Sequence, residues 1–150
     1  MNKKKRIFDG IRIILLLFFI GILLYPTISD YLSRINSSKV IQSYEKSMEG
    51  LDQETKDKML KAAQAYNSSL IGKEELYDPF MSVDKTDASY MNLLNTNGDG
   101  VMGYIQIPRI DVRLPIYHTT SDKVLQKGVG HLQGTSLPVG GASTHAALSG

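Results

Sequence analysis

The 150-residue sequence contains no cysteine, which limits the chemistry that these residues can perform by themselves. Without cysteine the sequence excludes a disulfide framework and thiolate metal sites. It also excludes a thiolate nucleophile, because the thiol group itself is absent. The lack of disulfides does not locate the protein, since many exported bacterial proteins also do without them. Any reaction of a cysteine thiolate would therefore depend on residues outside these 150.

Clustered positive charge is absent from most of the sequence. The formal net charge is +2, from 17 basic and 15 acidic residues. Five basic residues lie at or before Arg12, and the rest of the sequence holds 12 basic against 14 acidic residues, a balance of about −2. A nucleic-acid partner would need clustered basic residues on the folded part. We therefore expect no nucleic-acid partner. The early basic residues stand before an apolar segment: Lys3, Lys4, Lys5, Arg6 and Arg12.

Residues 13–28 are uncharged and almost entirely apolar. With about 16 residues, this segment lies between a signal-peptide core and the ~20 residues of a typical membrane span. It lacks a clear Ala-x-Ala cleavage site, although Thr27-Ile28-Ser29 is a weak substitute, and Arg12 can reach the headgroups to lengthen the span. We favour a transmembrane signal anchor over a cleaved signal peptide. Under the positive-inside tendency residues 1–12 are cytoplasmic, and the sequence after about Ser29 is extracellular.

Residues 29–72 carry the pattern of two amphipathic helices. Apolar residues recur at three- and four-residue spacing on both sides of Gly50, which breaks the pattern. Asp52 is the expected N-cap of the second helix, because its carboxylate can accept a hydrogen bond from a free N–H of the first turn. Gly72 suits a C-terminal cap. We expect both helices to pack on their own domain rather than on a partner. The apolar positions are Leu32, Ile35, Val40, Ile41, Tyr44, Met48, Met59, Leu60, Ala63, Tyr66 and Leu70.

Residues 73–100 form a polar linker with little periodicity, and its central feature is the tetrapeptide Tyr77-Asp-Pro-Phe80. Within it, Pro79 fixes its own φ and pushes Asp78 toward an extended conformation, so a carboxylate and an aromatic ring are displayed on a stiff tripeptide. Further on, Asn95-Thr-Asn-Gly-Asp-Gly100 resembles the start of a calcium loop. It begins with Asn, however, and Gln106 stands where a bidentate Glu is needed. We therefore expect a turn at this place and no metal site.

Residues 101–150 predict short strands punctuated by Gly and Pro, which is typical of an all-β barrel or sandwich. Pro115 has no N–H to donate, so it indicates an edge or a bulge in its strand. The expected elements are strands at 101–107, 112–117 and 143–148, a turn at 108–111, a short helix within 120–128 and a loop at 138–141.

Three histidines are the remaining candidates for a base or a metal site. The spacings of His118, His131 and His145, 13 and 14 residues, fit neither a helical nor a zinc-finger ligand set. His145 follows Ser143 by two residues, which in a strand places both on one face, but the sequence is not the Gly-x-Ser-x-Gly of a nucleophile elbow. We interpret His145 as structural, with its ring packed or hydrogen-bonded near the sheet.

Five segments in the last third of the sequence resemble the sortases, and most closely the pilin-polymerising class C sortases. The segments are Gly103–Pro108, Leu114–His118, Gly128–Leu132, Gly134–Gly141 and Ser143–His145, in that family's order. The resemblance implies a closed eight-stranded sortase β-barrel, of which residues 101–150 would form about the first half. The expected fold class is therefore mainly β with N-terminal helices, namely a transmembrane helix and two amphipathic helices before a truncated barrel. Half a barrel leaves unpaired edge strands, so we expect these residues alone not to form a stable enzyme domain.

The resemblance also implies where the functional residues lie. Asp78, Pro79 and Phe80 match the lid of class C sortases, in which Asp78 would pair with the catalytic Arg and Phe80 would cover the catalytic Cys. The family's catalytic His would follow immediately after Gly150, with its Cys and Arg further on. No catalytic residue is therefore expected within the 150, and these residues alone are expected to be inactive. Neither a cofactor nor a metal is implied.

For the complete protein the resemblance implies a membrane-anchored cysteine transpeptidase of Gram-positive bacteria. It would recognise an LPxTG-type sorting signal on pilin precursors, cleave after Thr and hold the product as a thioacyl intermediate. A Lys amine of a neighbouring pilin would then resolve the intermediate as an isopeptide bond. The alternatives are a housekeeping sortase that anchors proteins to the cell wall and a noncatalytic, membrane-tethered surface module.

Overall fold

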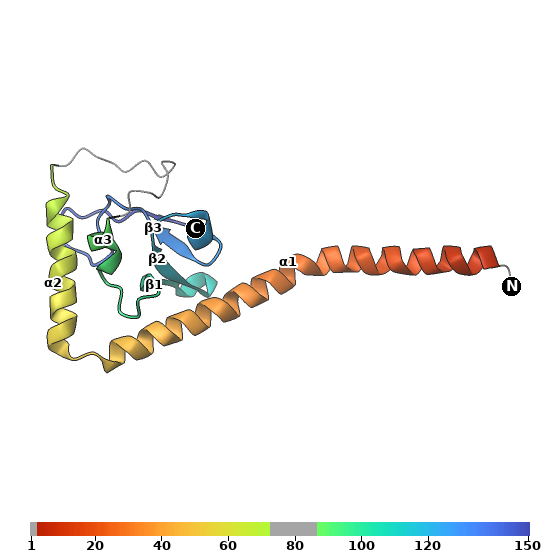
Figure 1. Ribbon diagram of the computed structural model, residues 1–150, viewed down its shortest axis with the longest axis horizontal. Helices are drawn as coiled ribbons and strands as arrows, with labels where there is room; N and C mark the ends of the chain where they lie inside the picture. The colour runs from red at the N-terminus through yellow and green to blue at the C-terminus, as the bar shows by residue number, and fades with distance from the viewer. Residues whose placement is uncertain (1–2, 73–86) are drawn as a thin grey trace. The chain divides into compact units, whose positions relative to one another are not determined.

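The computed structural model describes residues 3–72 and 87–150, with side chains from residue 9 onward (Figure 1). They divide into two compact units, Met1–Asn36 and Ser37–Gly150. Helix α1 (Lys3–Gly50) begins in the first unit and ends in the second. The elements that follow are α2 (Gln53–Ser69), α3 (Ala88–Asn92), β1 (Val101–Ile107), the 3-10 turn η2 (Pro108–Ile110), β2 (Val112–His118), α4 (Asp122–Leu125), β3 (Val129–His131) and β4 (Leu148–Ser149).

The first unit is the apolar part of α1. Among the described residues, the stretch Asp9–Gly50 is the one helix long and apolar enough to cross a membrane, with a mean hydropathy of 2.4 over its most apolar window and no part of that window buried. Its apolar side chains stay exposed, as Phe18 and Leu23 do at 62% and 75%. Such a surface is more favourable in lipid than in water. Length and composition therefore fit the predicted membrane span, and the helix continues past Pro26 without a break at the predicted boundary of residues 28 and 29.

The last part of α1 and the whole of α2 are the two long helices of the second unit. As predicted, α1 ends at Gly50 and Asp52 caps α2, its carboxylate accepting a hydrogen bond of 2.8 Å from the backbone N–H of Thr55. The hydrogen bonds from Thr55 lower the pKa of Asp52. Ile41 of α1 and Ala63 of α2, both from the predicted apolar stripe, are buried.

The predicted C-terminal cap of the second helix is wrong by two residues. Leu70 is the C-cap of α2, and Gly72 adopts a positive φ of 80° beyond it. Leu60, which we placed in the apolar stripe, is 41% exposed. It lies beside the buried positions rather than among them, because the buried stripe of α2 runs through Ala63 and Asn67, four residues apart.

A four-stranded sheet of order β1-β2-β3-β4 completes the second unit (Figure 1). Strands β1 and β2 form an antiparallel hairpin, β3 pairs parallel with β2, and β4 pairs antiparallel with β3. This sheet is open over the described residues, so the predicted closed barrel is not formed by them. Four strands, two of them only three and two residues long, are too few to close a barrel. Helix also predominates in this part of the chain, and the predicted mainly β class holds only from Val101 onward.

The predicted strand at 143–148 is wrong over most of its length. Only Leu148 and Ser149 pair with β3. Ser143 has a positive φ of 60°, and the Thr144 hydroxyl donates to the carbonyl of Gly141 at 2.8 Å, which turns the chain there. Backbone pairing starts only after this turn because an extended strand cannot contain a residue in the left-handed region.

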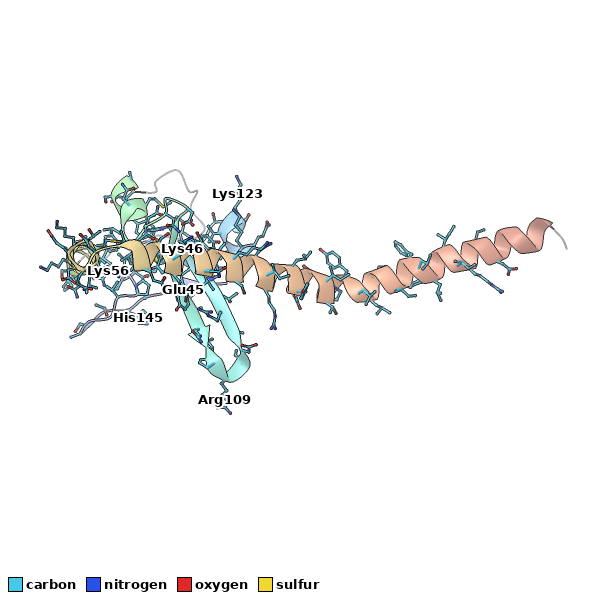
Figure 2. The ribbon with its side chains drawn as sticks, turned by 90° about the horizontal axis from the view of Figure 1, so that it is seen from below. Glu45, Lys46, Lys56, Arg109, Lys123 and His145 are labelled. Atoms are coloured by element: carbon cyan, nitrogen blue, oxygen red, sulfur yellow. The ribbon has the colours of Figure 1, made fainter. Side chains whose placement is uncertain are left out.

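The hairpin of β1 and β2 turns where the sequence predicts. The 3-10 turn η2 leads into Asp111, which is left-handed at φ 51°, and Arg109 lies at the tip (Figure 2). The register shift of the hairpin lies in β1, between Val101 and Gly103, and not at Pro115 as one of the two predictions had it. The other prediction, that Pro115 lies at an edge, holds for the side of β2 that faces β3. The strand β3 pairs only with residues 116–118, so Pro115 has a strand partner on the β1 side alone among the described residues.

The apolar core lies between α2, α3 and one face of the sheet. Its buried members come from each of these elements and from the loop after β3: Ala63, Tyr90, Met102, Ile116, Val129 and Leu137. Residues 116 and 118 of β2 are both buried, as expected for alternate residues on the face that meets the helices. The helices α2 and α3 therefore hold the sheet from one side.

Candidate functional site

The residues predicted to act directly in catalysis are not among those described. Asp78, Pro79 and Phe80, the predicted lid, lie in the segment 73–86 outside the described residues. The predicted catalytic His would follow Gly150. What the structure does describe is a framework of buried hydrogen bonds beside β3 and β4, built around Tyr90 of α3, which has a relative exposure of 0%.

Tyr90 and His131 form the centre of this framework. The hydroxyl of Tyr90 lies 2.9 Å from Nδ1 of His131, and Nε2 of His131 lies 2.9 Å from the carbonyl oxygen of Ser136. Because a carbonyl can only accept, Nε2 carries the hydrogen and Nδ1 accepts from the tyrosine hydroxyl. The same hydroxyl oxygen accepts from the backbone N–H of Thr119 at 3.3 Å. Every polar atom of the pair therefore has a partner while both side chains are neutral.

Burial keeps both groups uncharged. It lowers the pKa of His131, and repulsion from His118 lowers it further, while the hydrogen bond to Ser136 opposes them. Burial also raises the pKa of Tyr90 well above its ordinary value. His131 is consequently a neutral imidazole at neutral pH, with one donor and one acceptor nitrogen. It is not a base that is open to a substrate.

Thr135 connects this pair to β4. Its hydroxyl donates to the carbonyl of Leu132 at 2.8 Å and accepts from the backbone N–H of Ala147 at 3.1 Å. The backbone of Leu132 also donates to Ala147 at 3.0 Å, and His131 stands opposite Leu148 in the sheet. The loop after β3 and the strand β4 are thus fastened together immediately next to His131.

Asn67 fixes the far end of the same loop. Its amide oxygen accepts from the backbone N–H of Leu137 at 2.7 Å, and its amide nitrogen donates to the carbonyl of Leu137 at 3.2 Å. The side chain therefore pairs with one residue as a neighbouring strand would. Asn67 is 6% exposed, so both backbone groups of Leu137 are satisfied inside the protein rather than by water.

The end of β4 packs closely on β3. A Cβ at Gly150 would lie 3.2 Å from Cγ2 and 3.4 Å from Cα of Val129. Ser149 pairs with Gly130. The predicted catalytic His would thus follow a residue that lies directly against Val129, which is itself held between β2 and β4.

His118 lies on the other side of Tyr90. Its ring is nearly perpendicular to the Tyr90 ring, at 79° with 5.0 Å between centroids. Nδ1 lies 2.9 Å from the carbonyl oxygen of Gly100, and Nε2 lies 2.8 Å from that of Leu93. His118 is only 2% exposed.

The third histidine does not join this group. His145 is exposed, in the chain before β4 (Figure 2), so the predicted packing of its ring near the sheet is wrong. Its backbone carbonyl does accept from the N–H of Ser136 at 3.0 Å. The reason for the error is local, because the turn at Ser143 removes this segment from the sheet.

The segment compared with a calcium loop is a turn. The side-chain oxygen of Asn95 accepts from the N–H of Gly100 at 3.1 Å, and a carboxylate oxygen of Asp99 accepts from the N–H of Val101 at 3.0 Å. Gly98 and Gly100 both have positive φ. Asn and Asp side chains that accept from nearby backbone N–H groups are typical of such turns, as the sequence predicts here.

Sequence reasoning did not identify Tyr90, Thr135 or Asn67 as members of the framework. Asn67 carried a usable signal, since it interrupts the apolar positions of α2 four residues after Ala63. A polar residue on a buried face needs a hydrogen-bond partner. Tyr90 and Thr135 carried no such signal. The partner of Tyr90 lies on a strand that is distant in the sequence, and Thr135 lies in an irregular loop.

Solved structures similar to this chain are sortases of class C. Sortase C1 from Streptococcus agalactiae is 37% identical with a TM-score of 0.65, over 75% of this chain and 56% of that one. Sortase C-1 from Streptococcus pneumoniae is 42% identical with a TM-score of 0.62, over 73% and 56%. A sortase C structure from Streptococcus pneumoniae, described in terms of catalysis and pilin substrate specificity, is 37% identical with a TM-score of 0.61, over 73% and 53%.

The chain spans about half the length of these solved chains, 53–56%. No protein-family model and no curated protein matches it. Within the aligned region, this chain and these solved chains share 37–42% of their residues and a similar fold.

Proposed function

We propose that this chain, which is sortase C-like in sequence and fold, forms part of a membrane-anchored cysteine transpeptidase acting on pilin precursors. The observation that carries the proposal is its 37–42% identity to sortase C structures over about three quarters of its length. The reaction is cleavage of an LPxTG-type sorting signal after Thr, followed by transfer to a Lys amine of the next pilin. The Cys, the Arg and the His that perform it lie beyond Gly150.

The described residues contribute positioning to this proposed reaction. A His directly after Gly150 would continue β4, which His131, Thr135 and Leu132 hold against the loop after β3. A catalytic group must be held within a fraction of an ångström of its working position to be effective. In this proposal the buried pair of Tyr90 and His131 keeps that strand in place, and neither residue touches substrate.

The proposed lid is Asp78, Pro79 and Phe80. Asp78 would pair with the catalytic Arg and Phe80 would cover the Cys, so that a substrate enters only when the loop opens. The support is the sequence match to the lid motif of class C sortases. In the full-length protein, Asp78→Ala with Phe80→Ala should raise the rate at which a thiol reagent labels the Cys. The exposed Asp57 of α2 provides the matched control, since Asp57→Ala should leave that rate unchanged.

The proposed location is the cell membrane, with the second unit outside the cell. The support is the apolar helix Asp9–Gly50 and the basic residues that precede it. In a full-length variant whose native Cys is replaced by Ala, a cysteine placed at exposed Asp57 should react with a membrane-impermeant thiol reagent in intact cells. A cysteine placed near Lys4 should react only after the cells are lysed.

The test of the activity uses the full-length gene product with its native membrane helix. We expect it to cleave a quenched fluorescent peptide containing Leu-Pro-x-Thr-Gly, to lose this activity with a thiol reagent, and to spare the same peptide with Ala in place of Pro. We also expect it to join two purified pilin subunits through an isopeptide bond, detected by mass spectrometry.

The alternatives make different predictions in the same assays. A housekeeping sortase would cleave the peptide but attach the product to a cell-wall precursor amine and not to pilin. A noncatalytic surface module would neither cleave nor react with the thiol reagent. If the gene encodes no Cys after residue 150, the transpeptidase proposal is wrong whatever the assays show.

A further inference from the structure

We propose that His118 is a buried imidazolium cation whose second ring proton fastens the segment Leu93–Gly100 to the sheet. This inference does not depend on the proposed reaction. It concerns the framework alone, and it would hold for a noncatalytic module as well.

The two ring contacts of His118 carry the argument. Both are short, 2.9 Å from Nδ1 to the carbonyl of Gly100 and 2.8 Å from Nε2 to the carbonyl of Leu93. A carbonyl oxygen can only accept, and a neutral imidazole has one N–H and one lone pair. A neutral ring would therefore set its lone pair against one of these oxygens. Only the imidazolium form donates to both.

The same ring lies at a strained part of the backbone. Leu94 and Thr119 have φ of 58° and 67°, and both follow directly a residue of this contact, Leu93 and His118. Residues other than glycine persist in the left-handed region only where their surroundings hold them there. The backbone N–H of His118 also donates to the carbonyl of Gly100 at 3.0 Å. One residue thus holds both ends of Leu93–Gly100.

The neighbouring titratable groups are compatible with a cation at this place. Tyr90 of α3 stays neutral, since burial raises its pKa, and His131 of β3 stays neutral, since burial and then repulsion from His118 lower its pKa. The segment Leu93–Gly100 carries one carboxylate, Asp99; burial raises the pKa of Tyr117 on β2, and the field of Asp99 raises it further. Burial opposes the charge on the ring, so the two short contacts with carbonyl oxygens must compensate for it.

His118 and His131 thus share Tyr90 but differ in their partners. His131 faces one hydroxyl that donates and one carbonyl that accepts, which fits a neutral ring. His118 faces two carbonyls, which fits a charged one. Loss of the proton from Nδ1 would set a lone pair against the carbonyl oxygen of Gly100, which would keep only the backbone N–H of His118 as its donor. The segment would then be held by the backbone contact and one ring contact, so it should loosen as the pH rises.

Nitrogen NMR of the histidine rings tests the charge directly. In the full-length protein labelled on histidine, His118→Gln, His131→Gln and His145→Gln each remove the signals of one ring and so assign it. At about pH 7.5, one unit above the ordinary histidine pKa, we expect hydrogens on both nitrogens of His118. His131 should carry one on Nε2 only. Should His118→Gln fail to fold, the proximity of its ring protons to those of the Tyr90 ring, with 5.0 Å between the ring centroids, assigns the His118 signals.

Two results would overturn the proposal. The first is a His118 ring with one nitrogen that carries no hydrogen at that pH. The second concerns the fastening. Amide exchange of Gly100, corrected for the intrinsic effect of pH, should speed up by about tenfold as His118 loses its second hydrogen, while amides in the middle of α2 keep their protection. An unchanged Gly100 across that transition means that the proton does not fasten the segment.

Discussion

Gly103 in β1 and Gly130 in β3 belong to the same sheet, but their surroundings differ. A Cβ at Gly103 would meet no heavy atom within 4 Å, whereas a Cβ at Gly130 would lie 2.4 Å from the carbonyl oxygen of Thr119. Gly128, just before β3, is confined in the same way by the carbonyl oxygen of Pro115, at 2.7 Å. The tight fit of this sheet is therefore concentrated where β3 meets β2 and the chain that connects them.

The hairpin turn between β1 and β2 and the strand β3 also differ in burial. At the hairpin turn Ile110 is 61% exposed, and Arg113 of β2 reaches Glu45 of α1 through an ion pair of 2.8 Å between partly exposed side chains. At β3 all three residues are buried. The inner region, where β3 (Val129–His131) meets β2, therefore tolerates no added volume. The outer hairpin of β1 and β2 is held to α1 by contacts that water can replace.

The largest expected effect comes from adding one methyl group to the inner region. Gly130→Ala should destabilise the protein by about 4 kcal/mol or prevent folding, because the new Cβ meets rigid backbone and cannot be relieved by a rotamer change. Gly103→Ala is the matched change in the outer strand and should shift stability by less than about 1 kcal/mol. Urea unfolding of the full-length protein, followed by tyrosine fluorescence, measures both. Equal effects of the two variants would contradict the contrast between the strands.

A smaller effect is expected where α2 reaches the loop after β3. Asn67→Ala leaves the N–H and the carbonyl of Leu137 buried without partners, which should cost about 3 kcal/mol. Asn36 begins the same Asn-Ser-Ser tripeptide but is exposed on α1, so Asn36→Ala should change stability by less than about 0.5 kcal/mol. The same unfolding measurement decides. A loss at Asn67 no greater than that at Asn36 would show that water satisfies Leu137 instead.

The smallest effect is expected at the outer hairpin. Arg113→Ala removes the ion pair with Glu45 and the contact of the guanidinium with the Tyr104 ring, 4.9 Å from its centroid. Because both partners are partly exposed, the urea midpoint should move least of the three changes, and added salt should reduce the difference further. Lys58→Ala removes the more exposed pair with Glu54 and is the control, with no measurable shift expected. A salt-independent loss at Arg113 would show that ring packing, and not charge, holds the hairpin to α1.

Features that depend on neighbouring residues in the sequence were predictable. The end of α1 at Gly50, the cap at Asp52 and the turn before Asp111 each follow from the conformational preference of one or two residues. The strand at Val101–Ile107 follows from its alternation and flanking turn residues. The likeness to sortases was also visible in short motifs, since those motifs are contiguous.

Features that depend on residues far apart were not predictable from the sequence. Tyr90 meets His131 across 41 positions, and nothing near either residue announces the other. The strand expected from Ser143 failed because a positive φ at one serine overrode the apolar pattern after it. The prediction of a closed sheet failed for a related reason. The edge strands β1 and β4 find no further pairing partner among the described strands. Residue patterns indicate which groups are buried but not which groups they meet.

The hydrogen bonds between Asn67 and Leu137 have a consequence for biosynthesis. The two residues are 70 positions apart, so helix α2 is complete long before its partner has been made. At about 5–20 residues per second, roughly 4 to 14 s pass between the two. During this interval the side chain of Asn67 lacks its partner, although Tyr90, which packs on Tyr66, is made earlier. Translation, rather than the finished protein, is thus the stage at which a chaperone or a wrong partner can capture this helix.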